Sequence, residues 1–593
     1  MRLVKQLLAT AILLLILVGD SEAAGPYYVR PNGSTATNCT GLADADYDGS
    51  GTGEACAFNH PFWLTGVPVN CGGTSGPLAG GETAIIYPKS GGYDMGYGAP
   101  NTAGSTSYPW DCHMNPIPSG PNSSTKTKIY GSNYASCSSI SSATELYGKE
   151  RAYFVLNLRG SDNVDVRCLN VTDHSQCRHS GLAGEGLACP ASYPYGDYAL
   201  VGLDSTGSAN VNLKDIWIHG FASEGAGVDT PTDWTVENVN LWANGGINWN
   251  FNGSGAGGTT DQATGTMTFT GGIVAHGGCI ESYPPVSHDY DGITLYEPES
   301  CCSQSQSAVC ISDGLGTESN QASWIFDGVK YVRNVGDGLD LLYHDIDGGS
   351  GLVTVKNSKF LKNSGNQVKV GGNAILYNLA IDAECNYFSG KSYTYTGDGG
   401  FSDHCRAGGN AISIAFQTGT DVYVEGITVV NTANGEPFTI TARNIANCAG
   451  GNRLEIRNSI FTTTNGLGWI NIDGSCSSAT VQQDHSVIWG FLSNPTGTGN
   501  VFTNPGLSGT IIGSDQNFLI PSTSSSAYNI ADETAANQTS DDMFGFDRGA
   551  AWDAGAIEFG STDTGESGGG GGSSTGINAY ITGKASLTGG RIQ

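Results

Sequence analysis

Short alternating runs of hydrophobic and polar residues dominate the middle of the chain. In residues 352–363, LVTVKNSKFLKN, an alternating stretch is followed by the polar pair Asn357-Ser358 and by a second short apolar run. Alternation with a period of two predicts a half-buried strand, and the polar pair predicts a turn between two strands. The same arrangement recurs in residues 233–244, 322–334 and 452–463.

A second series of segments runs out of phase with the first and supplies a third strand. The steps between the segments that begin at residues 291, 313, 337 and 366 are 22, 24 and 29 residues. Three short strands in a repeat of about 22 to 30 residues are typical of a parallel β-helix, whose stacked turns bury a continuous core. The series comprises NGGINWN from Asn244, DGITLYE from Asp291, DGLGTES from Asp313, DGLDLLY from Asp337, NQVKVGG from Asn366, NAISIAF from Asn410, NGEPFTI from Asn434 and NGLGWIN from Asn465.

The composition agrees with an all-β fold. Glycine accounts for 88 of the 593 residues, charged residues make up only 14%, and helix-favouring runs are missing beyond the N-terminal segment. We therefore predict a single-domain, single-stranded parallel β-helix over residues 151–560. Residues 24–150 are expected to form an N-terminal cap with Cys-rich loops, because the end of a solenoid has to be covered. A Gly/Ser-rich linker (561–575) and a short tail (576–593) follow.

The N-terminus and the cysteines predict an exported protein. Arg2 and Lys5 precede the apolar run LLATAILLLILVG and the small residues of SEA, which indicates a secretory signal peptide over residues 1–23 and no transmembrane segment after its cleavage. Sixteen cysteines in a secreted or cell-surface chain indicate disulfides. The adjacent Cys301 and Cys302 are expected to join different partners. Cys279 and Cys310 are near in sequence, and the connectivity stays open.

The net charge argues against two classes of partner. Because 55 acidic residues face 26 basic ones, for a net charge of −29, nucleic acid and anionic membranes are poor partners. Such a surface favours solubility. An acidic exported protein is also suited to binding divalent cations, and Ca²⁺ prefers carboxylate oxygens.

Charged side chains fall at one phase of successive repeats. Asp340 and Lys369 each stand three residues after the start of their segment, so turns about 4.8 Å apart place them side by side on the outer face. Asp313 and Asp337 hold one turn position on successive turns. Stacked carboxylates raise one another's pKa unless a cation neutralises them. The pattern predicts a Ca²⁺ site formed by Asp313, Asp337 and Asp340.

Two interpretations of these residues stay open. Asp and Asn at such positions also begin strands, with their side chains bonded to the turn backbone, and we favour this for Asp291, Asn410 and Asn434. Lys369 is either a partner in an ion pair or a general base whose pKa a neighbouring cation lowers. As a base it would remove the proton on the carbon alpha to a uronate carboxylate. Loss of the oxygen at the β carbon then cleaves a polyuronate by β-elimination.

Two segments resemble the site of pectate lyases of the family-nine type, which are right-handed parallel β-helix enzymes. Their pattern is Asp-Asp-Gly-x-Asp on one turn and Gly-Asn-x-x-Lys-x-Gly-Gly on the next. Residues 336–340 (GDGLD) and 365–372 (GNQVKVGG) match it except at the first aspartate, which is Gly336 here. The resemblance implies a right-handed helix, Ca²⁺ ligands at Asp337 and Asp340, and a catalytic base at Lys369.

The predicted function is that of a secreted, Ca²⁺-dependent lyase acting on an acidic polysaccharide. Arg333 and His344 flank the acidic segment and are candidates for binding the anionic sugar, with a solvated surface position as the alternative for each. Paired carboxylates in the order that a polygalacturonase requires do not occur, which argues against glycoside hydrolysis. The alternative function is a non-catalytic adhesin or carbohydrate-binding β-helix, which the linker and tail favour.

Overall fold

The structure is a computed structural model that describes residues 25–561 with internal gaps. The predicted signal peptide, linker and tail lie outside the described residues. Among the residues that are described, no helix has the length and hydropathy that a membrane span requires. The longer gaps are 101–112, 176–198, 252–262, 303–311 and 396–409.

The chain forms two compact units, and the first comprises residues 1–173 and 190–217. Within it, β1, β4, β6 and β9 form one parallel ladder. Strand β5 pairs with β7, β7 pairs with β9, and β8 pairs with β10. The elements are β1 (Tyr27–Ser34), α2 (Phe62–Thr65), β2 (Gly66–Val67), β3 (Thr74–Ser75), β4 (Thr83–Ile86), β5 (Tyr93–Asp94), β6 (Thr127–Gly131), η2 (Ile140–Ser142), β7 (Thr144–Tyr147), β8 (Phe154–Asn157), β9 (Val164–Thr172) and β10 (Val201–Thr206), and the unit ends within β11 (Asn212–His219).

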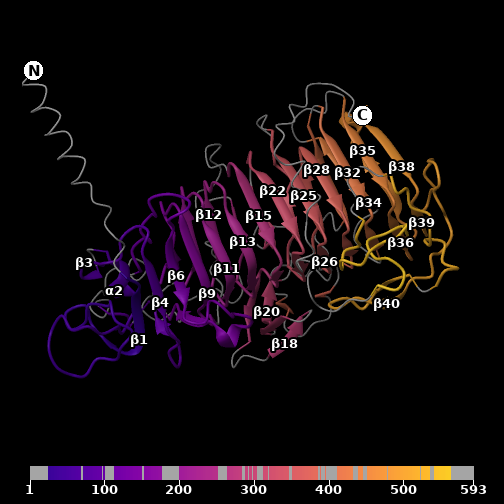
Figure 1. Ribbon diagram of the computed structural model, residues 1–593. Coiled ribbons are helices and arrows are strands. Elements are labelled where there is room, and N and C mark those ends of the chain that lie inside the picture. The colour runs from indigo at the N-terminus through magenta and orange to yellow at the C-terminus, as the bar shows by residue number, and fades with distance from the viewer. Residues whose placement is uncertain are drawn as a thin grey trace, which may run out of the picture. The chain divides into compact units, whose positions relative to one another are not determined.

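The second unit comprises residues 174–189 and 218–593, and the part of it that the structure describes is a parallel β-helix (Figure 1). Each turn contributes one strand to each of three parallel ladders, as the sequence predicts. The first ladder consists of β15 (Thr266–Thr270), β22 (Ser323–Asp327), β25 (Leu352–Lys356), β28 (Asn373–Tyr377), β32 (Asp421–Glu425), β35 (Arg453–Arg457) and β38 (Thr480–Asp484). The second consists of β16 (Ile273–Ala275), β23 (Lys330–Val332), β26 (Lys359–Leu361), β29 (Ala380–Asp382), β33 (Thr428–Asn431), β36 (Ile460–Thr463) and β39 (Val487–Trp489), and the longer β13 (Thr235–Trp242) pairs with both.

The third ladder carries the predicted acidic segment. It consists of β12 (Glu224–Asp229), β14 (Trp249–Asn250), β21 (Leu315–Gly316), β24 (Leu339–Leu341), β27 (Val368–Gly371), β31 (Ile412–Phe416), β34 (Phe438–Asn444) and β37 (Gly468–Ile472). Short elements outside the three ladders are β17 (Cys279–Glu281), β18 (Ser287–Tyr290), β19 (Ile293–Tyr296), β20 (Pro298–Cys302), β30 (Thr394–Tyr395), η4 (Gly474–Cys476), β40 (Ser508–Thr510) and β41 (Asn517–Leu519).

The core consists of rows in which one inward side chain per turn stacks on the next. Phe326, Val355, Leu376, Val424 and Ile456 are register partners on successive turns, and all five are fully buried. Burying an apolar side chain of this size contributes about 1.5–3 kcal/mol. These apolar side chains are buried only when the neighbouring turns are present, so the folding of adjacent turns is cooperative.

A left-handed residue marks the corner between the first and second ladders on each turn. Gly328, Asn357 and Asn458 have φ angles of 70°, 49° and 51°, and each follows the last residue of its strand. Glycine has no Cβ penalty there, and asparagine is tolerated because its side chain bonds to nearby backbone. The polar pairs in the sequence are therefore the corners of the helix, as predicted.

Buried amide side chains form a row of hydrogen bonds, the amide ladder, at the corner between the second and third strands of successive turns. The Nδ2 of Asn248 donates to Oδ1 of Asn334 at 3.1 Å, and the Nδ2 of Asn334 donates to Oδ1 of Asn363 at 2.9 Å. Asn363 in turn donates to Oε1 of Gln367 at 2.9 Å. These side chains are buried, so each bond satisfies a group that has lost its water.

Three disulfides have both cysteines among the described residues: Cys39–Cys56, Cys137–Cys168 and Cys279–Cys301. The third confirms that Cys279 is a partner of the adjacent cysteine pair. It joins β17 to β20, which pair antiparallel. Cys310 lies outside the described residues, so the expectation for Cys302 stays a prediction.

Replacing Asn334 by alanine should lower the free energy of unfolding by about 2–4 kcal/mol, because it leaves several buried polar groups unsatisfied. Among these are the amide of Asn248 and the backbone N–H of Gly277, which both bond to Asn334 Oδ1. Urea denaturation followed by circular dichroism measures the loss. The control is the exposed Gln482→Ala on β38, which should change stability by less than about 0.5 kcal/mol. Equal effects of the two substitutions would contradict a structural role for the amide ladder.

Candidate functional site

The predicted pair of Asp340 and Lys369 lies side by side in the third ladder. Asp340 on β24 is the register partner of Lys369 on β27, and the lysine Nζ lies 2.7 Å from Asp340 Oδ2. The same Nζ contacts Oδ2 of Asp337. The side chains of Lys369 and Asp340 are 12% and 15% exposed, and that of Asp337 is fully buried. One ammonium group therefore lies between two carboxylates of the preceding turn.

Asp313 and Asp337 also shape the turns on which they stand. Oδ1 of Asp313 accepts a hydrogen bond from the backbone N–H of Asp337 at 2.7 Å, and Oδ1 of Asp337 accepts one from the N–H of Asn366 at 2.6 Å. Each carboxylate thus caps the next turn through one oxygen, the role expected of Asp at such a position. The structural and functional interpretations are compatible, because each carboxylate has two oxygens and the cap uses one.

Glycine at position 336 is required by the packing of Asp313. A Cβ at Gly336 would lie 2.3 Å from Asp313 Oδ1. The same relation recurs one turn later, where a Cβ at Gly365 would lie 2.1 Å from Asp337 Oδ1. An aspartate at position 336, as the family pattern has it, would therefore displace the Asp313 carboxylate. In this chain the carboxylate of Asp313 occupies the space that the Cβ of a residue at position 336 would need.

The three aspartates form a donor set that suits a hard cation. Asp313, Asp337 and Asp340 each offer a carboxylate oxygen, and these oxygens lie within 4.8 Å of one another. The nearby Asn366 is buried, donates from Nδ2 to Asp337 at 3.0 Å, and leaves its Oδ1 without a hydrogen-bond partner among the described residues. Ca²⁺ takes six to eight oxygens in flexible geometry. The residues present therefore fit Ca²⁺. Without a bound ion, the ammonium group of Lys369 offsets the charge of Asp337 and Asp340.

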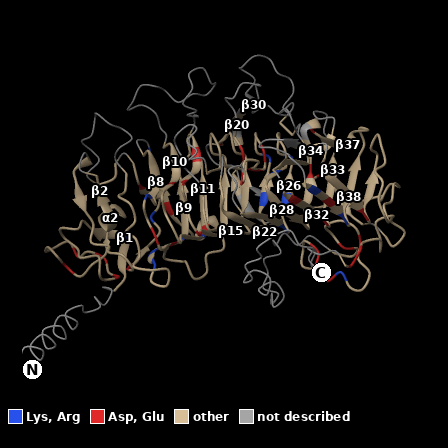
Figure 2. Cartoon of the chain, turned by 90° about the horizontal axis from the view of Figure 1, so that it is seen from above, with Lys and Arg blue, Asp and Glu red and all other residues tan. Residues whose placement is uncertain are grey.

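Burial and neighbouring charges act in opposite directions on the pKa of Asp340. Burial raises the pKa of the Asp340 carboxyl above its ordinary value, the Lys369 ammonium opposes that rise, and the Asp337 charge adds to it. Other basic residues of this unit are also paired across turns: Lys356 lies 2.9 Å from Asp327, and Lys362 lies 3.2 Å from Glu384. Figure 2 shows basic and acidic residues close together around β26 and β28.

Arg333 and His344 differ in their burial and in their contacts. The guanidinium of Arg333 lies over the ring of Tyr387, 4.4 Å from its centroid. His344 is fully buried, and its Nε2 and Nδ1 lie 2.8 Å from the carbonyl oxygen of Ala322 and 3.3 Å from that of Gly371. His344 therefore ties neighbouring turns together in the interior, and sugar binding by Arg333 or His344 stays a prediction.

Hydroxyl groups continue the row beyond Lys369. Ser413 on β31 is the register partner of Lys369, and Thr441 on β34 is the partner of Ser413. Both hydroxyls are buried and have no hydrogen-bond partner among the described residues. Ser413 stands three residues into its repeat, as Lys369 does, so the phase of the repeat already contained this signal. Thr441 stands seven residues after the start of its segment at Asn434, so it does not keep that phase.

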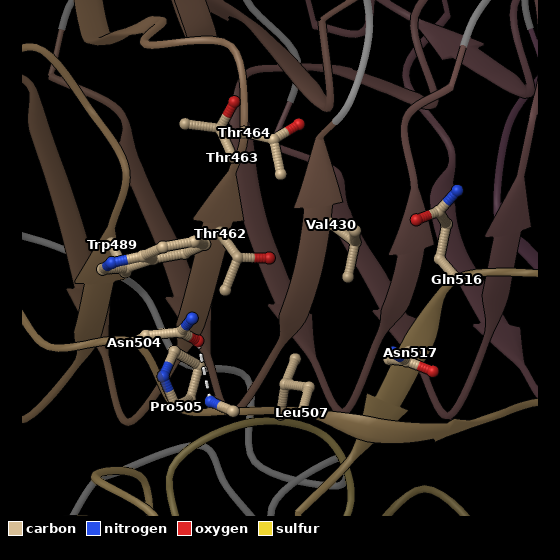
Figure 3. Close-up of a pocket in the computed structure, with 11 residues that line it drawn as sticks. Val430, Thr462, Thr463, Thr464, Trp489, Asn504, Pro505, Leu507, Gln516 and Asn517 are labelled. Atoms are coloured by element: carbon tan, nitrogen blue, oxygen red, sulfur yellow. Dashed lines mark hydrogen bonds between the residues drawn. The ribbon is translucent and has the colours of Figure 1, made fainter.

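A separate pocket opens on the outer side of the second ladder. It has a volume of about 260 Å³ and lies over the register partners Val430, Thr462 and Trp489. Figure 3 shows the indole of Trp489 beside Thr462, with Asn504 and Pro505 next to them and Gln516 and Asn517 opposite. The repeat gives no signal for this pocket, because residues 504–517 come from a later segment of the chain. Its remaining lining residues are Thr463, Thr464, Gly506 and Leu507.

The chain was compared with known proteins. No protein-family profile and no curated protein matches it. Among solved structures, pectate lyase Pel9A matches with a TM-score of 0.37 and 13% identity, over 91% of this chain and 97% of that one. The A-module of Azotobacter vinelandii mannuronan C-5 epimerase AlgE4 matches with a TM-score of 0.30 and 10% identity, over 67% and 90%. At these TM-scores the parallel β-helix of this chain rests on its own strand register.

Replacing Lys369 by methionine should destabilise the protein in a pH-dependent way. The variant leaves Asp337 and Asp340 without their cation, which costs about 3–5 kcal/mol for a buried pair. The raised pKa of Asp340 rises further, so the folded state binds a proton more readily than the unfolded state, and the deficit shrinks as pH falls through that pKa. Melting temperatures at pH 7 and pH 5 measure the difference.

The matched control for that measurement is Lys356→Met, which breaks the more exposed pair with Asp327. It should cost less than about 1 kcal/mol at either pH. A deficit of Lys369→Met that is the same at both pH values would show that the carboxylates do not depend on this ammonium group.

Proposed function

We propose that the protein is a secreted, Ca²⁺-dependent lyase that cleaves an acidic polysaccharide by β-elimination. The observation that carries the proposal is the lysine held between two carboxylates of the preceding turn, with a third carboxylate within reach. The disulfides are in keeping with an exported protein.

In this reaction Lys369 acts as the base. Its neutral amine takes the proton from the carbon alpha to a uronate carboxylate, and the electron pair of that C–H bond becomes the new C=C bond. The C–O bond at the β carbon breaks, and the departing oxygen takes a proton from water. Ca²⁺ at Asp313, Asp337 and Asp340 would neutralise the uronate carboxylate and acidify the proton to be removed.

The aspartates position the base as well as a cation. Asp337 and Asp340 both lie against the lysine Nζ and fix where it points from β27. A cation at the carboxylates competes with the ammonium for the same oxygens, which favours loss of the lysine proton. The row continues with the buried hydroxyls of Ser413 and Thr441, which have no hydrogen-bond partner among the described residues.

Incubation with polygalacturonate and with alginate tests this function directly. Ultraviolet absorbance of the unsaturated product should grow with added Ca²⁺ and fall to background in EDTA. Lys369→Ala should lower the rate at least about a hundredfold, the usual worth of a general base. Lys356→Ala should retain the wild-type rate. Full activity of a folded Lys369→Ala protein would rule out this base.

A second candidate function, binding of a carbohydrate without cleavage, is favoured by the pocket at Trp489. An aromatic ring with hydroxyl and amide groups around it is the kind of surface on which a sugar packs and forms hydrogen bonds. The pocket lies on the second ladder and the acidic row on the third, so the two functions rest on separate residues.

Affinity electrophoresis in gels that contain acidic or neutral polysaccharides tests the second candidate. Trp489→Ala should weaken binding by roughly five- to thirtyfold, which corresponds to about 1–2 kcal/mol for one aromatic anchor. The control is Phe546→Ala, another partly exposed aromatic residue that does not line the pocket. Equal mobility of Trp489→Ala and wild type in every gel that retards the wild type would exclude this pocket as the binding site.

A further inference from the structure

Two histidines and a glutamate of the second unit converge away from the acidic row. Nδ1 of His219 lies 2.8 Å from Oε2 of Glu281, and Nδ1 of His174 lies 3.3 Å from the same oxygen. His219 is the last residue of β11, Glu281 is the last residue of β17, and His174 follows β9. One candidate ligand atom from each of the three residues lies within 4.8 Å of those of the other two.

The surrounding backbone leaves room for the carboxylate and anchors it. Gly220 has a φ of 72°, and a Cβ there would lie 2.6 Å from Glu281 Oε2. Glu281 stands two residues after Cys279, whose disulfide to Cys301 joins β17 to β20. The disulfide therefore anchors the strand that carries the carboxylate, and the lack of a side chain at Gly220 leaves the space that the carboxylate occupies.

Aromatic rings enclose the cluster. The ring of His219 stacks on that of Trp242, with centroids 4.1 Å apart, and Tyr296 lies edge-on to His219 at 5.5 Å. His219 and Glu281 are fully buried, whereas the side chain of His174 remains 19% exposed. The cluster thus has a dry interior and one side open to solvent.

The glutamate is held as an anion but is only half satisfied. Burial raises the pKa of the Glu281 carboxyl, and the two imidazoles more than offset this, so that its pKa lies below the ordinary value. Oε2 faces both histidines, while the buried Oε1 has no hydrogen-bond partner among the described residues. An unpartnered oxygen on a buried carboxylate is costly, and it indicates that a ligand is missing.

We propose that His174, His219 and Glu281 bind a divalent transition-metal ion, Zn²⁺ by preference. Two imidazoles and one carboxylate are a typical three-residue zinc set, which leaves a fourth position for water. Bonds of about 2.0–2.1 Å in tetrahedral geometry place ligand atoms about 3.3 Å apart. The His174 separation meets this value, and the His219 separation needs to open by about half an ångström. Nitrogen ligands also separate this site from the all-oxygen set at Asp340, which suits Ca²⁺.

The bound ion would join three segments that are distant in sequence. His219 lies 62 residues before Glu281, and His174 lies 107 residues before it. A metal bound only by the folded state stabilises that state by mass action. The alternative is a carboxylate that the two imidazoles neutralise without any metal.

Zn²⁺ binding by the purified full chain distinguishes these possibilities. The protein is stripped with EDTA, returned to millimolar Ca²⁺ so that all-oxygen sites are filled, and then titrated with Zn²⁺ by calorimetry. We expect one equivalent to bind and the melting temperature to rise by about 3 °C. Co²⁺ in place of Zn²⁺ should give the visible absorption of a tetrahedral nitrogen–oxygen site. Binding should weaken as the pH falls, because protons compete with the metal for its ligands.

The variants are His174→Ala, at the partly exposed ligand, and the near-isosteric Glu281→Gln, each checked for folding by circular dichroism. Each should lower Zn²⁺ affinity at least about a hundredfold. His485→Asn serves as the control, because asparagine occupies the equivalent left-handed corner at Asn357 and Asn458. The proposal is overturned if the wild type takes up no Zn²⁺ under these conditions. It is also overturned if folded His174→Ala and Glu281→Gln proteins bind it as the control does.

Discussion

The in-register stacking of parallel turns is the constraint on which the second unit depends. Every residue of a turn lies next to the residue of equal phase on the turns before and after it, about 4.8 Å away. Apolar residues of equal phase build the core rows, of which Phe326, Val355 and Leu376 form one part. A shift of one residue would turn the inward set outward, so the buried rows hold the register of every other row.

That same constraint brings charged residues of equal phase together on successive turns. Asp340 and Lys369 meet in this way as opposite charges. Asp313 and Asp337 each give one oxygen to the backbone N–H of the next turn. The resulting arrangement stores several carboxylate oxygens around one ammonium group. The ammonium group offsets part of their charge, and carboxylate oxygens are the ligands that a hard cation prefers.

The two proposed cation sites differ in the part of the fold that supplies their ligands. The acidic row comes from the repeat itself, with residues contributed by consecutive turns, and it offers oxygen atoms only. The cluster at Glu281 comes from strand ends and from an antiparallel pair that is fastened by the Cys279–Cys301 disulfide. Residues outside the repeat are free of its phase, so two histidines and a carboxylate can meet there without a matching row on either side. Oxygen ligands favour Ca²⁺ and imidazoles favour Zn²⁺.

The sequence alone determined the three-strand repeat, the corners at residues such as Asn357, and the adjacency of Asp340 and Lys369. These follow from alternation within a strand and from the phase of the repeat, both of which are local. Only the tertiary structure decided that His344 is buried between turns, that Asp313 leaves no room for a Cβ at position 336, and that residues 504–517 complete a pocket over Trp489. It alone brought His174 and His219 to Glu281. Their separations in the chain follow no period, and contacts of that kind depend on where loops and strand ends pack.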